Sequence, residues 1–166
     1  MSNQGVREIK VWYLEITEEE QFIPSEVVTN LSLKPTDDAA INTQFYCEVG
    51  GDWRWVDRLN WTDKEWEEWV SRENLRTWVA HLGAEEVGYV EMEIQEGGSI
   101  EIVYFGLLPL MIGKGIGGGM LSLAVQEAWK IKGTKRVWLH TCSEDHPHAL
   151  GNYEKRGFRS FKIEVI

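Results

Sequence analysis

The sequence predicts a mixed α/β (α+β) fold in which helices cover a mostly antiparallel central sheet. Three strand-like segments follow one another closely, at residues 76–82, 86–95 and 99–107, and the short glycine turns between them favour an antiparallel meander. After this meander, helical and strand-like patterns alternate to the end of the chain. The length of 166 residues suits one domain with a substantial core, so we expect a single domain over residues 1–166.

The segments before the meander predict one strand and two helices. Alternating residues at 8–14 indicate a strand, whereas residues 21–35, with two of the four prolines, favour a loop. Thr36 could cap a helix that ends at the Gly50-Gly51 pair. Thr62-Asp63-Lys64-Glu65 has the pattern of a capping box, which predicts the start of a second helix.

The segments after the meander predict two further helices and two strands. Apolar residues recur at helical spacing from Met120 to Ile131, and Gly133 could end this helix. Residues 136–142 favour a strand, 148–156 a short helix and 158–166 a last strand. This alternation places the later helices on a sheet that the meander begins.

Composition narrows the partners and the compartment. The formal net charge of −10 disfavours nucleic acid and anionic membrane, and no apolar run is long enough to span a bilayer. An acidic balance fits a small cationic or amine partner, although it is also a common aid to solubility. Two cysteines and an N-terminal segment without an apolar stretch suit a reducing compartment, so we expect a cytoplasmic protein.

A glycine-rich turn between a strand and a helix is the most informative motif. Residues 107–119 read Leu-Leu-Pro-Leu-Met-Ile-Gly-Lys-Gly-Ile-Gly-Gly-Gly. Backbone N–H groups point outward at a helix N-terminus, where the aligned peptide dipoles favour negative charge. Glycine has no Cβ, so the backbone can approach a ligand closely. The turn therefore predicts a site for a phosphate-bearing cofactor.

Two common phosphate-binding motifs do not explain this turn. Gly113, Gly115 and Gly118 satisfy G-x-G-x-x-G, but no acidic residue ends the next strand, around residues 138–140, and too few residues remain for a doubly wound sheet. The pattern G-x-x-x-x-G-K-[ST] of nucleotide-binding loops is absent. A flexible turn without a ligand is the remaining alternative, but several glycines at a helix start need a reason.

The turn resembles the signature of the GNAT superfamily of N-acetyltransferases, which use acetyl-CoA. That signature is Gln/Arg-x-x-Gly-x-Gly/Ala, after a strand that ends in hydrophobic-x-Pro. Here Leu107-Leu108-Pro109 precedes Ile112-Gly113-Lys114-Gly115-Ile116-Gly117. Ile112 stands where Arg or Gln is usual, so a side-chain contact is lost while the backbone donors remain.

A second segment is similar to another motif of the family, Asn-x-x-Ala-x-x-x-Tyr-x-Lys-x-Gly-Phe. Residues 146–158 match it at five positions, and His146 replaces the usual Asn. One helix and one strand separate the two motifs, as in the family. The matching positions are Ala149, Tyr153, Lys155, Gly157 and Phe158.

The resemblance implies a mixed, mostly antiparallel sheet with helices on both faces, and acetyl-CoA as the cofactor. It implies that backbone groups before the proline hold the pantetheine arm and that the amides of the turn hold the diphosphate. The implied cofactor-binding residues are Gly106, Leu107, Leu108, Ile112, Gly113, Lys114, Gly115, Ile116, Gly117, Gly118, His146, Ala149 and Tyr153.

The chemistry needs a proton donor for the leaving thiolate and a base for the attacking amine. The resemblance implies that Tyr153 is the donor; the alternative is a tyrosine that only packs in the core. Glu101 is our candidate base, because burial in an apolar strand raises the pKa of a carboxyl group. Glu91 and Glu93, or a route through water, are alternatives. All three could also be solvated strand residues.

The acceptor side is expected in the aromatic segment at residues 50–61, which connects the first two helices. Aromatic faces and carboxylates suit a cationic amine, whereas Arg54 and Arg58 could bind a carboxylate. Packing of the tryptophans onto the sheet is the alternative. The candidate acceptor-binding residues are Trp53, Trp55, Asp57 and Arg58.

A zinc site is the competing interpretation of His140, Cys142, His146 and His148, but their spacing is irregular for known sites, so we expect no metal. The sequence thus favours an acetyl-CoA-dependent N-acetyltransferase that acts on a primary amine of a small molecule, as a monomer or homodimer. Acetylation of a protein N-terminus or lysine, and a non-catalytic acyl-CoA-binding module, are the alternatives.

Overall fold

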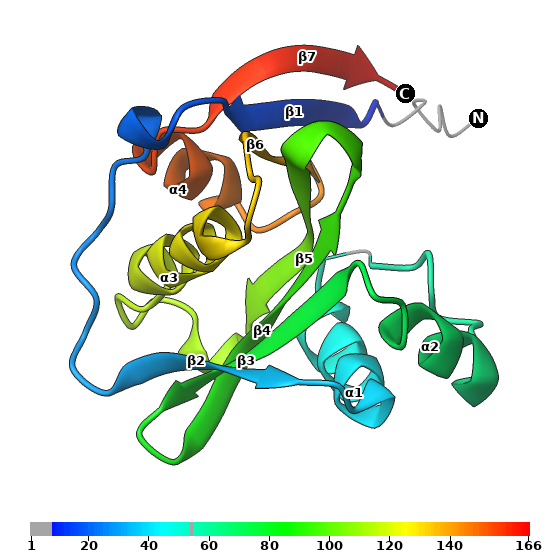
Figure 1. The fold of residues 1–166 in the computed structure, drawn as a ribbon. Helices are drawn as coiled ribbons and strands as arrows, with labels where there is room; N and C mark the ends of the chain where they lie inside the picture. The colour runs from blue at the N-terminus through cyan, green and yellow to red at the C-terminus, as the bar shows by residue number, and fades with distance from the viewer. Residues whose placement is uncertain (1–7, 54) are drawn as a thin grey trace, which may run out of the picture.

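A computed structural model describes residues 8–53 and 55–166, which form one seven-stranded sheet with the strand order β2-β3-β4-β5-β6-β1-β7 (Figure 1). This arrangement confirms the mixed α/β prediction, and β3, β4 and β5 form the expected antiparallel meander. The elements are β1 (Lys10–Ile16), β2 (Leu31–Thr36), α1 (Ala39–Gly50), α2 (Asp63–Val70), β3 (Leu75–Leu82), β4 (Glu85–Ile94), β5 (Ser99–Leu107), α3 (Gly117–Lys130), β6 (Arg136–Cys142), α4 (Ala149–Lys155) and β7 (Arg159–Val165).

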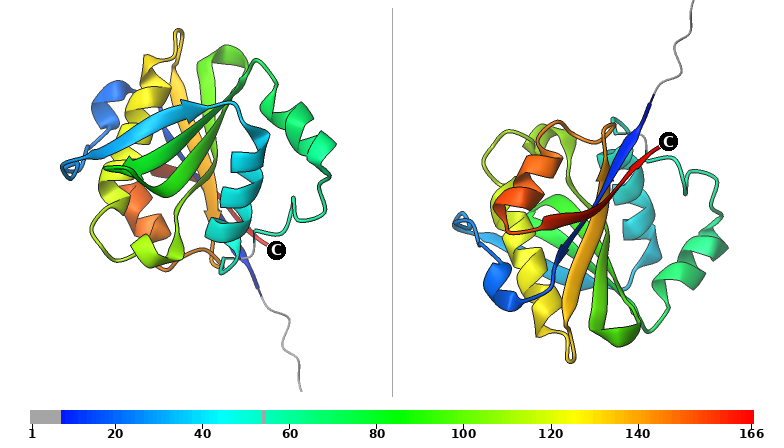
Figure 2. Two further views of the ribbon diagram at one scale, coloured as in Figure 1. Left: turned by 90° about the horizontal axis from the view of Figure 1, so that it is seen from below. Right: turned by 90° about the horizontal axis from the view of Figure 1, so that it is seen from above.

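Helices cover both faces of the sheet. The α1 and α2 helices lie on one face, and the α3 and α4 helices lie on the other (Figures 1 and 2). The α2 helix begins at the predicted capping box: Thr62 Oγ1 accepts from the Glu65 N–H, and Glu65 Oε1 accepts from the Thr62 N–H. In the described part of the chain, no helix is both long and apolar enough to cross a membrane.

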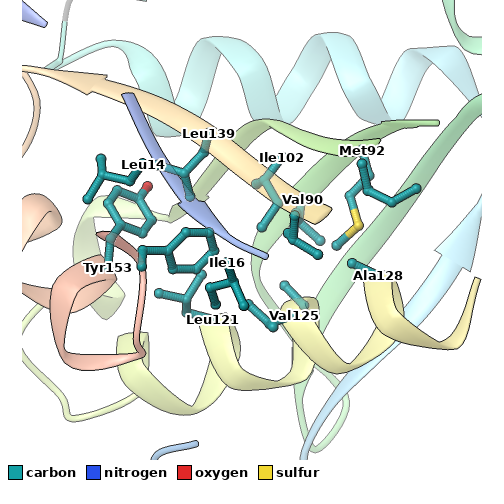
Figure 3. Close-up of a cluster of buried hydrophobic side chains, with 14 of the residues drawn as sticks. Leu14, Ile16, Val90, Met92, Ile102, Leu121, Val125, Ala128, Leu139 and Tyr153 are labelled. Atoms are coloured by element: carbon teal, nitrogen blue, oxygen red, sulfur yellow. The ribbon is translucent and has the colours of Figure 1, made fainter. Parts of the chain in front are cut away.

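The first strand of the chain lies inside the sheet, next to the last one. β1 pairs antiparallel with β6 on one side and with β7 on the other. Its Leu14 and Ile16 are fully buried and join the cluster that includes Leu121 and Val125 of α3 (Figure 3). Burial of these apolar side chains fixes the register of β1, because a shift by one residue would expose them.

β5 and β6 are parallel and are paired over a short stretch only. The register joins Ser99 with Arg136, Ile100 with Val137 and Glu101 with Trp138, and no later pair forms. The rest of β5 is paired with β4 alone, down to Leu107. Backbone groups along one edge of β5 are therefore not used in the sheet, which sets up the site described below.

One prediction for the first half of the chain is wrong in part, and a second is wrong. The segment 21–35, expected to be a loop, has no helix or strand over residues 22–30, but residues 31–35 belong to β2, an edge strand paired with β3. Pro35 is tolerated there because an edge strand has one side without ladder hydrogen bonds. Thr36 ends this strand instead of capping a helix. The cap of α1 is Asp38, whose Oδ1 accepts from the Ala40 N–H at 3.0 Å.

Candidate active site

The glycine turn leaves open space in front of the first turn of α3. Gly113 and Gly115 have φ angles of +83° and +77°, and nothing lies within 4 Å of a Cβ built on either residue. Ile116 occupies the N-cap position and has no side-chain acceptor for the N–H groups at the start of α3. Those donors are therefore available to an anionic ligand.

The side chains in this turn divide into two kinds. Lys114 is exposed with its two neighbouring glycines, whereas Ile116 is buried in the cluster with Met120 and Leu31. Gly117 and Gly118 belong to the first turn of α3. Of the residues predicted here, Ile116 can offer only its backbone to a ligand, because its side chain is part of the core.

At the end of β5, fewer backbone groups are free to bind the pantetheine arm than the sequence predicts. The Leu108 N–H donates to the Val87 carbonyl at 2.8 Å, so this amide is not free, contrary to its expected role. The Gly106 carbonyl oxygen lies 2.4 Å from a Cβ built on Gly88, so it also faces β4. Since backbone groups alternate along a strand, Leu107 turns its N–H and C=O to the opposite edge, which β6 leaves unpaired.

Tyr153 lies on α4 beside the part of β5 that is not paired with β6. Its ring packs edge-on against Phe105 of β5, with 6.2 Å between centroids, and against Phe158 at 6.0 Å. The residue is 8% exposed and lies close to Leu14 and Leu139 (Figure 3). Burial, and then the charge of Asp145, raise the pKa of Tyr153, so its hydroxyl keeps its proton at neutral pH.

The structure brings together two residues that the sequence assigned to different ligands. The Trp53 ring, from the connection of α1 to α2, packs edge-on against the His146 ring at 5.0 Å. His146 precedes α4; its Nδ1 accepts from the His148 N–H at 3.0 Å, and its carbonyl accepts from the Ala149 N–H. Burial, and then the nearby His148, lower the pKa of His146. The acceptor segment therefore reaches the start of the second motif.

A buried ion pair forms the centre of the α1 and α2 side. Arg58 Nη1 donates to Glu91 at 2.8 and 3.0 Å, and the two side chains are 5% and 0% exposed. Glu91 also accepts from Trp69 Nε1 at 2.6 Å and from Asn42 Nδ2 at 3.1 Å. Glu91 thus serves as a fully hydrogen-bonded counter-ion, and a direct contact between Arg58 and an acceptor stays a prediction.

Aromatic rings enclose the Arg58 guanidinium. Its Cζ atom lies 4.5 Å from the centroid of Trp69 and 4.6 Å from those of Trp61 and Tyr104. The cation is thereby held by ring faces as well as by Glu91. We call Arg58, Glu91, Trp61, Trp66, Trp69 and Tyr104 the arginine cage; Trp66 completes it at 5.3 Å. The cage fastens the connection between α1 and α2 to the sheet.

Glu101 differs from the other carboxylates on this face. It pairs in register with Glu93, so both side chains point to the α1 and α2 side. Glu93 accepts from Arg72 at 2.7 Å and from Gln95 at 2.9 Å, and despite its burial these hydrogen bonds lower its pKa. Burial, reinforced by the Glu93 charge and opposed by Arg58, raises the pKa of Glu101 to about 7.

The other acceptor candidates surround Tyr104 of β5. The Trp55 ring lies 4.7 Å from the Tyr104 ring, and exposed Asp57 accepts from the Tyr104 hydroxyl at 3.5 Å. Arg54, also expected here, lies outside the described residues. The Trp55 side chain packs directly against the backbone of Gly50, since a Cβ built on Gly50 would lie 2.4 Å from it. An aromatic wall with one carboxylate at its edge therefore borders β5.

The family model described as "Acetyltransferase (GNAT) family" matches residues 41–158. This chain is a member of the GNAT acetyltransferase family. The match extends from α1 to the end of the second motif and so includes both halves of the site. No curated protein matches the sequence.

Solved structures share the GNAT fold at low identity. A GCN5-related N-acetyltransferase from Sphaerobacter thermophilus has a TM-score of 0.72 at 19% identity, over 95% of this chain and 50% of that chain. A GCN5-related N-acetyltransferase from Kribbella flavida has a TM-score of 0.68 at 15% identity, over 94% of this chain and 56% of that chain. The third structure is an aminoglycoside acetyltransferase from an uncultured soil metagenomic sample, in complex with sisomicin. It has a TM-score of 0.58 at 15% identity, over 74% of this chain and 82% of that chain. This GNAT chain spans about half of the length of the first two structures.

The GNAT site contains residues that sequence reasoning did not select. Tyr104 was hidden in the apolar strand, although the alternation of side chains in β5 could have placed it opposite Phe105. Asn42 and Tyr46 lie on α1 and contact the arginine cage, and only the packing of α1 on the sheet identifies them. Within the described residues, no group of three potential metal ligands comes together, His140 and Cys142 included.

The arginine cage predicts a large effect of Arg58→Met on stability. The substitution leaves the Glu91 carboxylate buried without its cation, so we expect the free energy of unfolding to fall by about 3–5 kcal/mol in urea denaturation. The double variant Arg58→Met/Glu91→Leu should recover much of this loss. Lys64→Met, which removes an exposed pair with Glu68 at 3.9 Å, is the control and should change little. An Arg58→Met variant as stable as this control would contradict the role of the cage.

Proposed function

We propose that this GNAT protein is an acetyl-CoA-dependent N-acetyltransferase that moves the acetyl group to a primary amine of a small molecule by direct attack on the thioester. The observation that carries the proposal is the position of the unpaired β5 edge, between the uncapped start of α3 and a half-buried carboxyl group, Glu101, whose pKa is near 7. Acetyl-CoA, when bound, supplies the acetyl group in an activated form.

The residues around α3 fit the donor. The amides of residues 113–118 would bind the diphosphate, since the open glycine positions leave room for phosphate oxygens. Leu107 would bind the pantetheine arm through its backbone groups on the free edge of β5. An N–H group on this edge also suits a developing negative charge on the thioester oxygen. Ile112 has no polar side chain to offer, so binding would rest on the backbone here.

We assign proton removal from the acceptor to Glu101. A base works best when its pKa lies near the operating pH, and the pKa of Glu101 is about 7. Glu91 and Glu93 are poorer candidates, because their oxygens are already bonded to Arg58 and Arg72. The same β5 strand would thus position both the thioester and the base.

We assign proton donation to the leaving thiolate to Tyr153. A thiol has a pKa of roughly 8.5, so a hydroxyl that donates to the sulfur favours departure of the thiolate. Burial raises the pKa of Tyr153, which makes it a weaker acid, so the assignment rests on the position of its ring beside β5. Contact with Phe105 supports this role, because it holds the tyrosine ring against β5.

An amine acceptor suits the other side of β5. Trp53 and Trp55 offer ring faces to a cation, and Asp57 offers a carboxylate at the rim. One structure with the same fold is an aminoglycoside acetyltransferase in complex with sisomicin. This similarity supports small-molecule amines as the first class of acceptor to test. We also propose a cytoplasmic location, which the free thiols of Cys47 and Cys142 support.

The decisive experiment measures free thiol released from acetyl-CoA with polyamines, amino acids, aminoglycosides and peptides as acceptors. We expect release with at least one small amine and none without an acceptor. Release with peptides alone would support acetylation of proteins instead. Calorimetric binding of acetyl-CoA without thiol release from any acceptor would favour a non-catalytic acyl-CoA-binding module.

Glu101 predicts the pH dependence of the reaction. The carboxylate is the active form of the base, so kcat/KM should rise with pH and level off above about 7. Glu101→Gln should lower kcat/KM by about 10²-fold or more and remove this rising limb of the pH profile. Glu93→Gln is the matched control: loss of its negative charge lowers the pKa of Glu101, so the limb should move to lower pH. A limb that persists near pH 7 in Glu101→Gln would exclude this base.

Tyr153→Phe tests the proton donor. The substitution removes the hydroxyl and keeps the ring that packs on Phe105, so turnover should fall by about 10²-fold while the Kd for acetyl-CoA changes little. Calorimetry gives the Kd, and thiol detection gives kcat. Unchanged turnover would remove Tyr153 as the donor, and a parallel loss of cofactor affinity would indicate a binding role instead.

A further inference from the structure

A basic cavity adjoins the glycine turn. It has a volume of about 350 Å³ and lies between the first turn of α3 and the exposed side of α4. His148, Lys155 and Arg156 contribute basic groups, and Asn152 contributes an amide. No carboxylate lines it. The lining is completed by Gly118, Pro147 and Gly151.

The charge of this cavity is unusual for the protein. The chain has 27 acidic and 17 basic residues, so a cavity with cations and no carboxylate departs from the average surface. Among the described residues, Lys155 and Arg156 make no ion pair with any carboxylate, whereas Arg58, Arg72 and Arg136 each do. The cavity therefore has positive charge that the protein itself does not neutralise.

Arg156 is held against the start of α3. A Cβ built on Gly118 would lie 2.7 Å from Arg156 Nη1, so a side chain at this position would push the guanidinium away from the helix. Arg156 Nε is buried and has no hydrogen-bond partner among the described residues. Arg156 also lines the cavity, and phosphate oxygens match a planar guanidinium that has no carboxylate partner among the described residues.

The position of the cavity selects one group of the cofactor. The amides of residues 113–118 are assigned above to the diphosphate, and Gly118 belongs to both the turn and the cavity. In coenzyme A, the ribose that follows the diphosphate carries a phosphate on its 3′ oxygen. This group is the next anion along the molecule and would reach basic side chains beside the diphosphate site.

We propose that this cavity binds the 3′-phosphate of coenzyme A, with Arg156 as its principal ligand and Lys155 as a second cation. The inference rests on the proposed function. Lys155 at the end of α4 and its C-cap, Arg156, would then supply the side-chain charge that Ile112 does not supply in the turn. The protein then distinguishes coenzyme A from 3′-dephospho-coenzyme A, which shares the diphosphate and the pantetheine arm.

Calorimetry with coenzyme A and 3′-dephospho-coenzyme A tests the proposal without any catalytic readout. The protein should bind coenzyme A roughly tenfold more tightly, the size expected for hydrogen bonds to a charged group. Arg156→Gln should weaken the binding of coenzyme A and remove most of the difference between the two compounds, and it should leave the affinity for the dephospho form unchanged. Lys155→Gln, at an exposed position, should show the same pattern to a smaller extent.

Arg159→Gln is the matched control, because Arg159 is exposed on β7 and outside the cavity; both affinities should stay as they are. Circular dichroism establishes that each variant is folded. Equal affinity of the unaltered protein for both compounds would overturn this inference and leave the proposed function intact. An equal loss of both affinities in Arg156→Gln would also overturn it. If neither compound binds, the proposed function fails together with it.

Discussion

The early end of the pairing between β5 and β6 is the constraint on which the site depends. Parallel strands normally exchange hydrogen bonds along their length, and here only three residue pairs do so. Beyond Glu101, the free edge of β5 needs other partners, because backbone N–H and C=O groups are costly to leave unsatisfied. Both the glycine turn and Tyr153 lie beside this edge, so the interruption of the sheet creates the place where a ligand can pair with the backbone.

The two faces of β5 separate two tasks. An extra residue in β5 between the partners of Glu91 and Met92 shifts the register, so that Tyr104 faces α1 and Phe105 contacts Tyr153 of α4. On the first face, the arginine cage holds the segment that carries Trp53, Trp55 and Asp57. A buried ion pair is a weak source of net stability, but it fixes a geometry, since either partner alone would be a buried charge. We regard the cage as the rigid support of the acceptor wall.

Charged side chains also differ between the proposed cofactor site and the proposed acceptor site. The chain is acidic as a whole, but three basic residues and no carboxylate line the cavity where α4 meets α3. An anionic cofactor would meet repulsion elsewhere on the protein, so local cations and helix N–H groups have to compensate. On the acceptor face, the acidic balance agrees with a cationic amine. The two ligands of the proposed reaction thus meet surfaces of opposite character.

Local patterns predict the mixed fold, the meander, the capping box of α2 and the glycine turn, because each depends on periodicity or on residues close in the chain. They do not predict β2, because a short edge strand with a proline gives a weak local pattern and forms by pairing with β3. Long-range packing places β1 between β6 and β7, encloses Arg58 with Glu91 and brings Arg156 against Gly118. These contacts join residues far apart in the chain, and their energies come from burial and charge pairing that no local pattern encodes.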